Sequence, residues 1–226
     1  MRKYFKYFFY LYVFIGYSLS NAGSYDDFFA AMHLDRADVI QKLLVRGFDP
    51  NTPNEKGVAG LLVAIQSEAP KSALTLAKHP QANLNVQNQL GETPLMLAAI
   101  NNHLELAKVL IQRGAEVNKT GWTPLHYAAT RGHREMMRLL LDNDAYIDSE
   151  SANGTTPLMM AAYSAPPLAV KLLLEEGADP TLVNNGNASA LDLAVRVDQP
   201  QSVFYIKAFT EAWYIQNPIK EESATK

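Results

Sequence analysis

Apolar residues come in paired segments separated by polar turns along most of this chain. The first segment of a pair is short and rich in alanine, as at residues 95–99, and the second is longer with aliphatic residues at helical spacing, as at residues 104–111. Spacings of three and four residues are typical of helices that bury one face. The pattern therefore predicts a succession of two-helix units.

One seven-residue segment returns at nearly constant spacing. Residues 93–99, 123–129 and 156–162 all begin Thr-Pro-Leu and end Ala-Ala, and their threonines lie 30 and 33 residues apart. A weaker copy, residues 189–194, follows 33 residues after the third threonine. A unit of this size cannot bury its apolar face alone, so a fixed period predicts a stacked array of repeats.

The residues at the ends of the predicted helices agree with this interpretation. Thr93 is a favourable N-cap because its hydroxyl can accept a hydrogen bond from a free amide of the first turn. Pro94 follows at the first helical position, where its missing N–H costs nothing. Gly114 comes after the second helix, where a left-handed residue ends the helix. In repeat five, Pro166 and Pro167 are tolerable only in a first turn.

The repeat resembles the ankyrin repeat, whose pattern is a turn glycine, Thr-Pro-Leu-His-x-Ala-Ala, Gly-His, an aliphatic helix and Gly-Ala-Asp-x-Asn. The resemblance implies an all-α repeat solenoid of stacked helix-turn-helix units joined by β-hairpins or turns. It covers residues 25–209, and the second unit is the most degenerate. The expected divisions are a signal peptide at 1–22, a repeat domain at 23–210 with units at 25–56, 57–90, 91–120, 121–153 and 154–185 and a cap at 186–210, and a helix end with a polar tail at 211–226.

The step from repeat three to repeat four is three residues shorter than the next step. The missing residues fall in the segment 118–122, so this connection has lost most of its hairpin. We expect a notch in the row of hairpins with Trp122 near its edge. The sequence leaves open whether the notch binds a partner or is a tolerated deletion.

The first 22 residues have the composition of an export signal. Arg2, Lys3 and Lys6 precede an aromatic-rich apolar run at residues 8–19, and small residues follow at 20–22. The run is too short to span ~30 Å of hydrocarbon comfortably as a helix. We expect cleavage after Ala22, with an uncleaved N-terminal membrane anchor as the alternative.

Loss of this segment would make the protein more acidic. It removes three of the 20 Lys and Arg residues and none of the 23 Asp and Glu residues, so the formal net charge changes from −3 to −6. An acidic surface argues against nucleic acid and anionic membranes as partners and favours a partner with a basic face. Absence of cysteine excludes a lipidated cysteine and suits a repeat stack that needs no disulfides, so a bacterial periplasmic location fits best.

The sequence offers no clear catalytic or cofactor site. His126 is the histidine of the Thr-Pro-Leu-His motif, and the resemblance implies a structural role for it, as for His103 and His133 between helices. No histidines have metal-ligand spacing, and residues 142–153 lack the glycine and glutamate of a calcium loop. No nucleophile or phosphate-binding motif is present. We expect no enzyme, no cofactor and no bound metal.

The resemblance implies a protein partner bound across a concave face made of hairpin tips and first helices. Trp122, Arg131 and Tyr163 are our predicted anchors, because Trp, Tyr and Arg dominate binding energies; packing between repeats is the alternative role for the aromatics. Further candidate contacts are Gln89, Glu92, Ile100, Asn101, Thr130, Ser151, Thr155 and Ser164. We expect a monomer that binds another exported protein as inhibitor, immunity factor or accessory factor, or else a membrane-tethered envelope scaffold.

Overall fold

The computed structural model describes residues 23–216. The expected signal peptide at 1–22 and the last ten residues, 217–226, lie outside the described part. The chain divides into two compact units at Pro94, an N-terminal unit ending there and a C-terminal unit beginning at Leu95.

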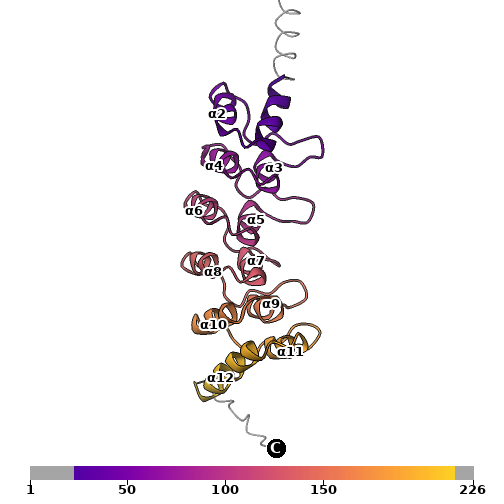
Figure 1. Cartoon of the computed structure of the whole chain (residues 1–226), viewed down its shortest axis with the longest axis vertical. Coiled ribbons are helices and arrows are strands. Elements are labelled where there is room, and N and C mark those ends of the chain that lie inside the picture. The colour runs from indigo at the N-terminus through magenta and orange to yellow at the C-terminus, as the bar shows by residue number, and fades with distance from the viewer. Residues whose placement is uncertain (1–22, 217–226) are drawn as a thin grey trace, which may run out of the picture. The chain divides into compact units, whose positions relative to one another are not determined.

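The N-terminal unit holds repeats one and two. It consists of a helix at residues 23–33, α2 (Ala37–Val45), α3 (Gly60–Gln66) and α4 (Pro70–Lys78), and α4 packs on both α2 and α3 (Figure 1). The core is formed by side chains that are almost completely buried, such as Phe28, Met32, Ile40, Leu62 and Leu76. In repeat two the 7-residue α3 is followed by the 9-residue α4, the pairing of a short helix with a longer one that the sequence pattern predicts.

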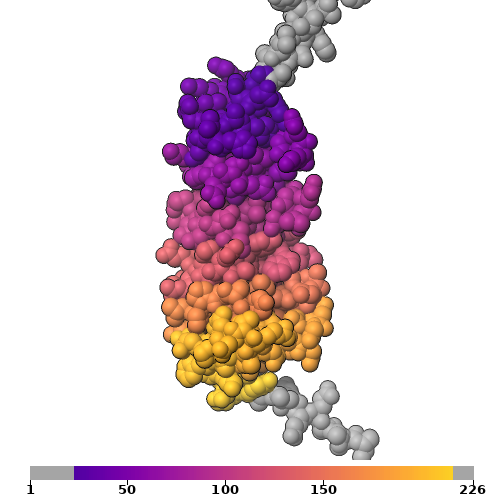
Figure 2. All heavy atoms as spheres, turned by 45° about the vertical axis from the view of Figure 1, so that its right-hand side comes forward, coloured from indigo at the N-terminus to yellow at the C-terminus, as the bar shows by residue number. Residues whose placement is uncertain are grey.

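The C-terminal unit continues the same arrangement in two rows of helices. The inner row contains α5 (Pro94–Ile100), α7 (Pro124–Arg131), α9 (Pro157–Ser164) and α11 (Ala190–Arg196). The outer row contains α6 (Leu104–Gln112), α8 (Arg134–Leu141), α10 (Pro167–Glu175) and α12 (Pro200–Gln216). In the space-filling view the successive repeats of this unit form successive bands (Figure 2). Alanines of the repeated Ala-Ala, including Ala128, Ala129, Ala161 and Ala162, are fully buried, so neighbouring inner helices can approach closely.

The predicted helix ends are present in the structure. Helices α5, α7, α9 and α10 each begin with proline, and the Thr156 hydroxyl accepts a hydrogen bond from the amide of Met159 at 3.4 Å. Gly114 has φ +87° just after α6, as a left-handed helix end requires. The outcome confirms the all-α repeat fold expected from the sequence.

Most repeats are connected by a tight turn rather than by a long hairpin. A backbone amide donates to the carbonyl four residues later, and the side chain that begins the turn accepts amide bonds from within it. The described residues contain only the isolated bridges Pro53–Ala59 and Val183–Ser189, and no longer strand. The turn bond links Asn54 to Val58, Asn88 to Glu92, Ser151 to Thr155 and Asn184 to Ala188.

The connection before Trp122 differs from these turns, as its length predicts. Residues 120–122 form a bend in which Gly121 has φ +84°. Asn118, two residues before this bend, is fixed to the next repeat, because Asn118 Oδ1 accepts from the Tyr146 amide at 2.8 Å and Nδ2 donates to the Asp144 carbonyl at 2.7 Å. The shortened connection is therefore anchored at its start.

The bonds of Asn118 are one case of a recurring joint between repeats. A polar side chain at the end of one repeat accepts the amide of the turn that ends the next repeat, and an asparagine there also donates to a carbonyl of that turn. Two further joints are made by Asn51 with Asn83 and Gln81, at 2.7 and 2.8 Å, and by Asp148 with the Asp179 amide, at 3.1 Å.

Within residues 23–216, no helix has both the length and the apolar character needed to cross a membrane.

Candidate functional site

His126 lies at the centre of a buried hydrogen-bond network at the start of α7. Its Nδ1 accepts from the Thr123 amide at 3.2 Å and lies 2.9 Å from the Thr123 hydroxyl, and its Nε2 lies 2.9 Å from the Thr155 carbonyl. Since Nδ1 accepts an amide hydrogen, the proton of the neutral ring belongs on Nε2, which donates to Thr155. The histidine thus ties repeat four to repeat five, in the structural role that the resemblance implied.

The environment of His126 favours its neutral form. The side chain is completely buried, and this burial lowers its pKa, although the bond to the Thr155 carbonyl favours the charged form. Neutral imidazole matches the hydrogen bonds described above, because Nδ1 must keep a lone pair for the Thr123 amide. His126 is consequently a fixed part of the stack.

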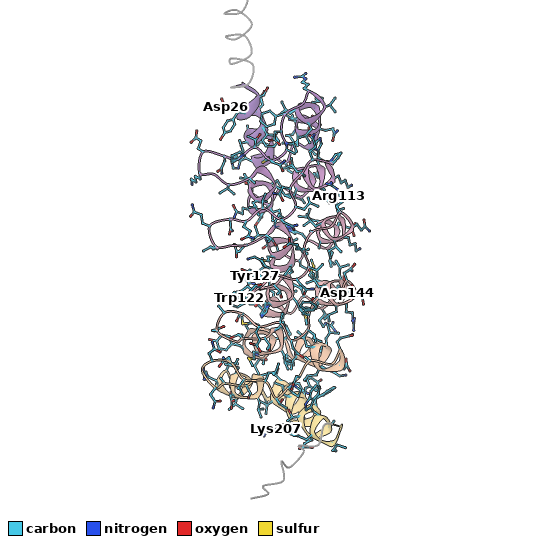
Figure 3. All side chains as sticks on the ribbon, turned by 180° about the vertical axis from the view of Figure 1, so that it is seen from behind. Asp26, Arg113, Trp122, Tyr127, Asp144 and Lys207 are labelled. Atoms are coloured by element: carbon cyan, nitrogen blue, oxygen red, sulfur yellow. The ribbon has the colours of Figure 1, made fainter. Side chains whose placement is uncertain are left out.

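Trp122 covers this network from outside. Its ring centroid lies 5.2 Å from that of His126 and 5.9 Å from that of Tyr127, the latter in an edge-to-face arrangement. Trp122 and Tyr127 lie together along the inner row, and Asp144 lies at the outer row (Figure 3). Trp122 stays 38% exposed, so it both packs on its own repeat and presents a ring surface to solvent.

The C-terminal ends of the inner helices form a second exposed edge. Ser164 at the end of α9 donates to the Thr130 carbonyl of α7 at 2.9 Å, which holds the two ends side by side. His133, just after α7, is linked in the same way to the end of α5, with Nε2 3.0 Å from the Ile100 carbonyl. Asn101, Thr130, Arg131 and Tyr163 belong to this edge, and Trp122 lies at the opposite end of α7.

The three predicted anchors are exposed and have unused donors. Tyr163 is 49% exposed and Arg131 is exposed as well. Among the residues that the structure describes, no hydrogen bond or ion pair involves the Trp122 indole N–H, the Arg131 guanidinium or the Tyr163 hydroxyl. A rigid inner row therefore offers two ring surfaces and three kinds of donor.

The other predicted contacts fall into three groups. Asn101 is exposed, and Thr130 is half-buried with its hydroxyl donating to the His126 carbonyl at 2.8 Å. Thr155 and Ser151 are each only 5% exposed, because the turn at residues 151–155 closes on itself, with the Thr155 amide donating to the Ser151 hydroxyl at 3.0 Å. Gln89 and Glu92 belong to the N-terminal unit, where Glu92 Oε2 accepts from Asn88 at 2.7 Å.

Tyr127 is a surface residue that the sequence prediction omitted. It occupies the variable position of Thr-Pro-Leu-His-x-Ala-Ala, between His126 and the buried Ala128. Because the residues on both sides of Tyr127 are buried on the inward face of α7, the helical spacing could have indicated that Tyr127 itself faces the surface. Its ring extends the exposed surface of Trp122.

Each unit has a hollow that borders its inner helices. In the C-terminal unit a hollow of about 440 Å³ lies between the turns that follow α9 and α11, lined by Ser164, Pro166, Pro167, Gln199 and Pro200 among others. In the N-terminal unit a hollow of about 400 Å³ is lined by Tyr25, Phe29, His33 and Lys56 among others. Both are open and shallow enough to suit a protein surface better than an enclosed small ligand.

The described residues contain no cluster of three or more His, Asp or Glu side chains able to hold a metal ion.

The family description "Ankyrin repeats (3 copies)" matches residues 28–120, 61–151 and 117–184. The chain therefore belongs to the ankyrin-repeat family, a class of proteins whose fold serves in general as a non-catalytic protein-interaction module.

Similar proteins include curated relatives and solved structures. The ankyrin repeat and SAM domain-containing protein 6 of Rattus norvegicus is 32% identical over 75% of this chain and 16% of its own length, and its Mus musculus counterpart is 32% identical over 68% and 14%. The chain thus spans less than a fifth of these relatives. The human ASB11 ankyrin repeat domain has a TM-score of 0.72 at 27% identity, covering 80% of this chain and 82% of that one. An ankyrin repeat domain of Acinetobacter baumannii AYE has a TM-score of 0.72 at 23% identity, covering 80% and 96%, which shows the fold alone.

Proposed function

We propose that this ankyrin-repeat chain binds another exported protein through the inner row of its C-terminal unit, with Trp122, Arg131 and Tyr163 as anchors. The observation that carries the proposal is the combination of exposure and unused donors at these three side chains. Partly buried aromatic and arginine side chains on a rigid support supply most of the binding energy at protein interfaces. The bound protein would be inhibited, neutralised or assisted by this contact.

The charge of the mature chain supports a basic partner. A formal net charge of −6 follows from loss of the three basic residues in the first 22. Such an excess of negative charge accelerates the encounter with a positively charged protein. Added salt screens this attraction and slows the association. Arg131 would then serve as a local donor within an acidic surface, pairing with a carboxylate or carbonyl of the partner.

Two matched double variants test the proposed surface. We expect Trp122→Ala with Arg131→Ala to abolish capture of the partner from an envelope fraction, without lowering the melting temperature by more than a few degrees. The control is Tyr146→Ala with Arg138→Ala, which likewise removes one aromatic side chain and one arginine, from α8 and its following turn; Tyr146 is 69% exposed. Equal capture by the two variants would rule out the anchors.

A photo-reactive group locates the contact directly. Benzoylphenylalanine placed at Tyr163 should cross-link the captured protein, and the same group at Tyr146 should not. Cross-links from Tyr146 alone would move the interface to the outer row. The alternative role as a membrane-tethered envelope scaffold does not require a specific cross-link from either position.

Export is the second part of the proposal, with cleavage after Ala22 and release into the periplasm. Amino-terminal sequencing of the protein from an exporting bacterium should give a mature chain that starts at Gly23. A chain that retains Met1 and sediments with membranes would instead support the tethered envelope scaffold. Retention in the cytosol would contradict both versions.

A further inference from the structure

The last helix, α12, has apolar residues on all sides. Its 17 residues are twice as many as in most helices of the chain, and it packs on α10 and α11. One side is fixed by this packing, with Ser202 and Ile206 completely buried. Large apolar side chains that stay exposed on one side of a helix, while its other side is packed, mark a candidate contact surface. The opposite side of α12 is exposed, and Figure 2 shows the yellow residues of this region at the surface.

The exposed side of α12 carries a regular stripe. Phe204, Ala208, Glu211 and Ile215 follow one another at spacings of four, three and four residues, and all four are exposed. Phe204 is 62% and Ile215 82% exposed. Spacings that alternate between three and four are those of the contact seam between two packed helices. We call these four residues the α12 stripe.

We propose that the α12 stripe is a self-association surface on which α12 of a second copy of this chain packs antiparallel. In this register Phe204 faces Ile215 of the other copy, and Ala208 faces Glu211. The small Ala208 leaves room for the two backbones to approach at the centre. The large side chains at both ends of one stripe then cover those of the other, so a single two-fold axis satisfies both copies.

Charge selects a second copy as the occupant. Glu211 is a carboxylate within an otherwise apolar stripe, and such a group is retained at an interface only with a partner of opposite charge. Lys207 lies beside Ala208 on the flank of the same stripe, so antiparallel packing brings Lys207 of each copy to Glu211 of the other. Within the described chain, Lys207 and Glu211 form no ion pair. The stripe and its flank together therefore supply both groups of the ionic contact, Glu211 and Lys207.

The size of the surface sets the expected strength. One helix from each copy supplies an interface at the small end of the specific range, below about 1,200 Å² in total. We expect a weak and reversible dimer rather than a permanent one. The proposal departs from the sequence-based expectation of a monomer and does not depend on the anchors Trp122, Arg131 and Tyr163.

Sedimentation equilibrium of the full chain, as the expression host leaves it, tests association. Over a range of about 1 to 300 µM we expect the mean mass to rise from one copy to two. Phe204→Ala should weaken the dimer by about tenfold or more, since the aromatic ring is lost from the end of the seam. The control is Leu90→Ala, which removes a side chain that is even more exposed, at 81%, from outside the stripe, and should change nothing.

Charge reversal gives the decisive test. Lys207→Glu places two carboxylates against each other in every contact, and Glu211→Lys places two ammonium groups there, so each variant alone should be monomeric over the same range. An equimolar mixture should form a 1:1 heterodimer, because each Glu then meets a Lys of the other chain. A destabilising effect within one chain would not be reversed by mixing, so recovery of the dimer on mixing must come from contacts between chains. Unchanged melting temperatures would show that both variants fold.

Several outcomes would overturn the proposal. They are a single-copy mass up to the highest concentration, a dimer that both charge reversals leave intact, or a mixture that stays monomeric. A chain that dimerises only after residues 217–226 are deleted would also overturn it, since the tail would then be the natural cover of the stripe. Association through residues 1–22 would persist in every variant, because none of the variants changes those residues. This persistence would distinguish it from association through the α12 stripe.

Discussion

The first helices of repeats two and four begin in opposite ways. In repeat four, α7 begins with its own local network, in which Thr123 and His126 bind each other and Pro124 sets the first turn. In repeat two, α3 follows Ala59, which gives no side-chain cap, and begins with Gly60. The Gly60 amide donates instead to the Thr52 carbonyl at 3.1 Å.

The start of α3 is specified by packing from outside its own segment. A Cβ on Gly60 would lie 2.9 Å from both the Met32 and the Phe28 side chains, so the helix at residues 23–33 approaches the backbone of α3 directly. The start of α7 is specified mainly by hydrogen bonds that its own residues supply. The comparison shows that one repeat position can be fixed by local capping or by close approach of a neighbour, and only the first leaves a clear motif.

The largest effect is expected from emptying the His126 site. His126→Ala leaves the Thr123 amide and the Thr155 carbonyl without their partners and opens a cavity, so we expect a loss of about 3 kcal/mol in the free energy of unfolding. Urea titration followed by circular dichroism measures it. His126→Met is the matched control, because Met96 and Met159 occupy the same position in repeats three and five, and it should cost clearly less than alanine. Equal costs would show that the cavity contributes little and that the lost hydrogen bonds account for the destabilisation.

A smaller loss is expected from crowding the start of α3. Gly60→Ala gains helix propensity but forces Phe28 and Met32 to move, and we expect a net loss of about 1 kcal/mol. Both tryptophans lie outside the N-terminal unit, so hydrogen exchange of residues 28–65 is the suitable measurement. In a Phe28→Leu background the same substitution should cost less. Identical costs in both backgrounds would mean that the close approach is not what requires glycine.

A gain of about 0.5 to 1 kcal/mol is expected from Asp148→Asn at neutral pH, because asparagine keeps the bond from the Asp179 amide and adds a donor, as Asn118 does at the equivalent joint. Burial raises the pKa of the Asp148 carboxyl; the hydrogen bond from the Asp179 amide opposes the rise, and the Asp179 charge adds to it. The native state thus holds this proton more tightly than the unfolded state. Ionised Asp148 destabilises the fold at pH 7, and the cost disappears as pH falls below the unfolded pKa of about 4. Thermal melts at pH 7 and pH 3.5 would reveal a gain at the first pH only.

The smallest effect is a pH dependence that originates at His126. Its pKa is lowered by burial, so the unfolded state binds this proton more readily than the native state. Stability is therefore complete above the unfolded pKa of about 6.5 and falls as pH drops through the folded pKa. Melting temperatures between pH 7.5 and about 5 should decline for the natural chain and less steeply for His126→Met. Parallel slopes would assign the decline to other groups.

The fold was predictable wherever a repeat states its motif locally. Thr123, Pro124 and Gly114 indicate helix boundaries in the sequence, because capping and φ preferences act within a few residues. Repeat two was harder, because the signal for α3 resides in Phe28 and Met32, some thirty residues earlier. The last helix was expected to continue past the cap boundary at residue 210, and α12 runs to Gln216.

The candidate surface was predictable only in part. Trp122, Arg131 and Tyr163, which were chosen by their position in the repeat, are exposed in the structure, because variable positions of a repeat face outward. Thr155 was chosen in the same way, but it is buried within the turn at residues 151–155. Trp122 and Arg131 lie at opposite ends of α7, about 12 Å apart along the helix, a separation that the sequence pattern did not specify. Spacing in a sequence gives the face of a helix more readily than the end of that helix on which a partner lies.

The polar joints between repeats have a consequence for how such a chain can change length. Asn118 and Asp148 bind backbone groups of the following turn, and every residue except proline offers the same amide whatever its side chain. The hydrogen bonds of each joint therefore do not depend on which side chain, other than proline, follows in the next repeat's turn. Repeats cut and spliced at these positions should be interchangeable units, and the three residues lost before Trp122 show a connection trimmed while the joint at its start was kept.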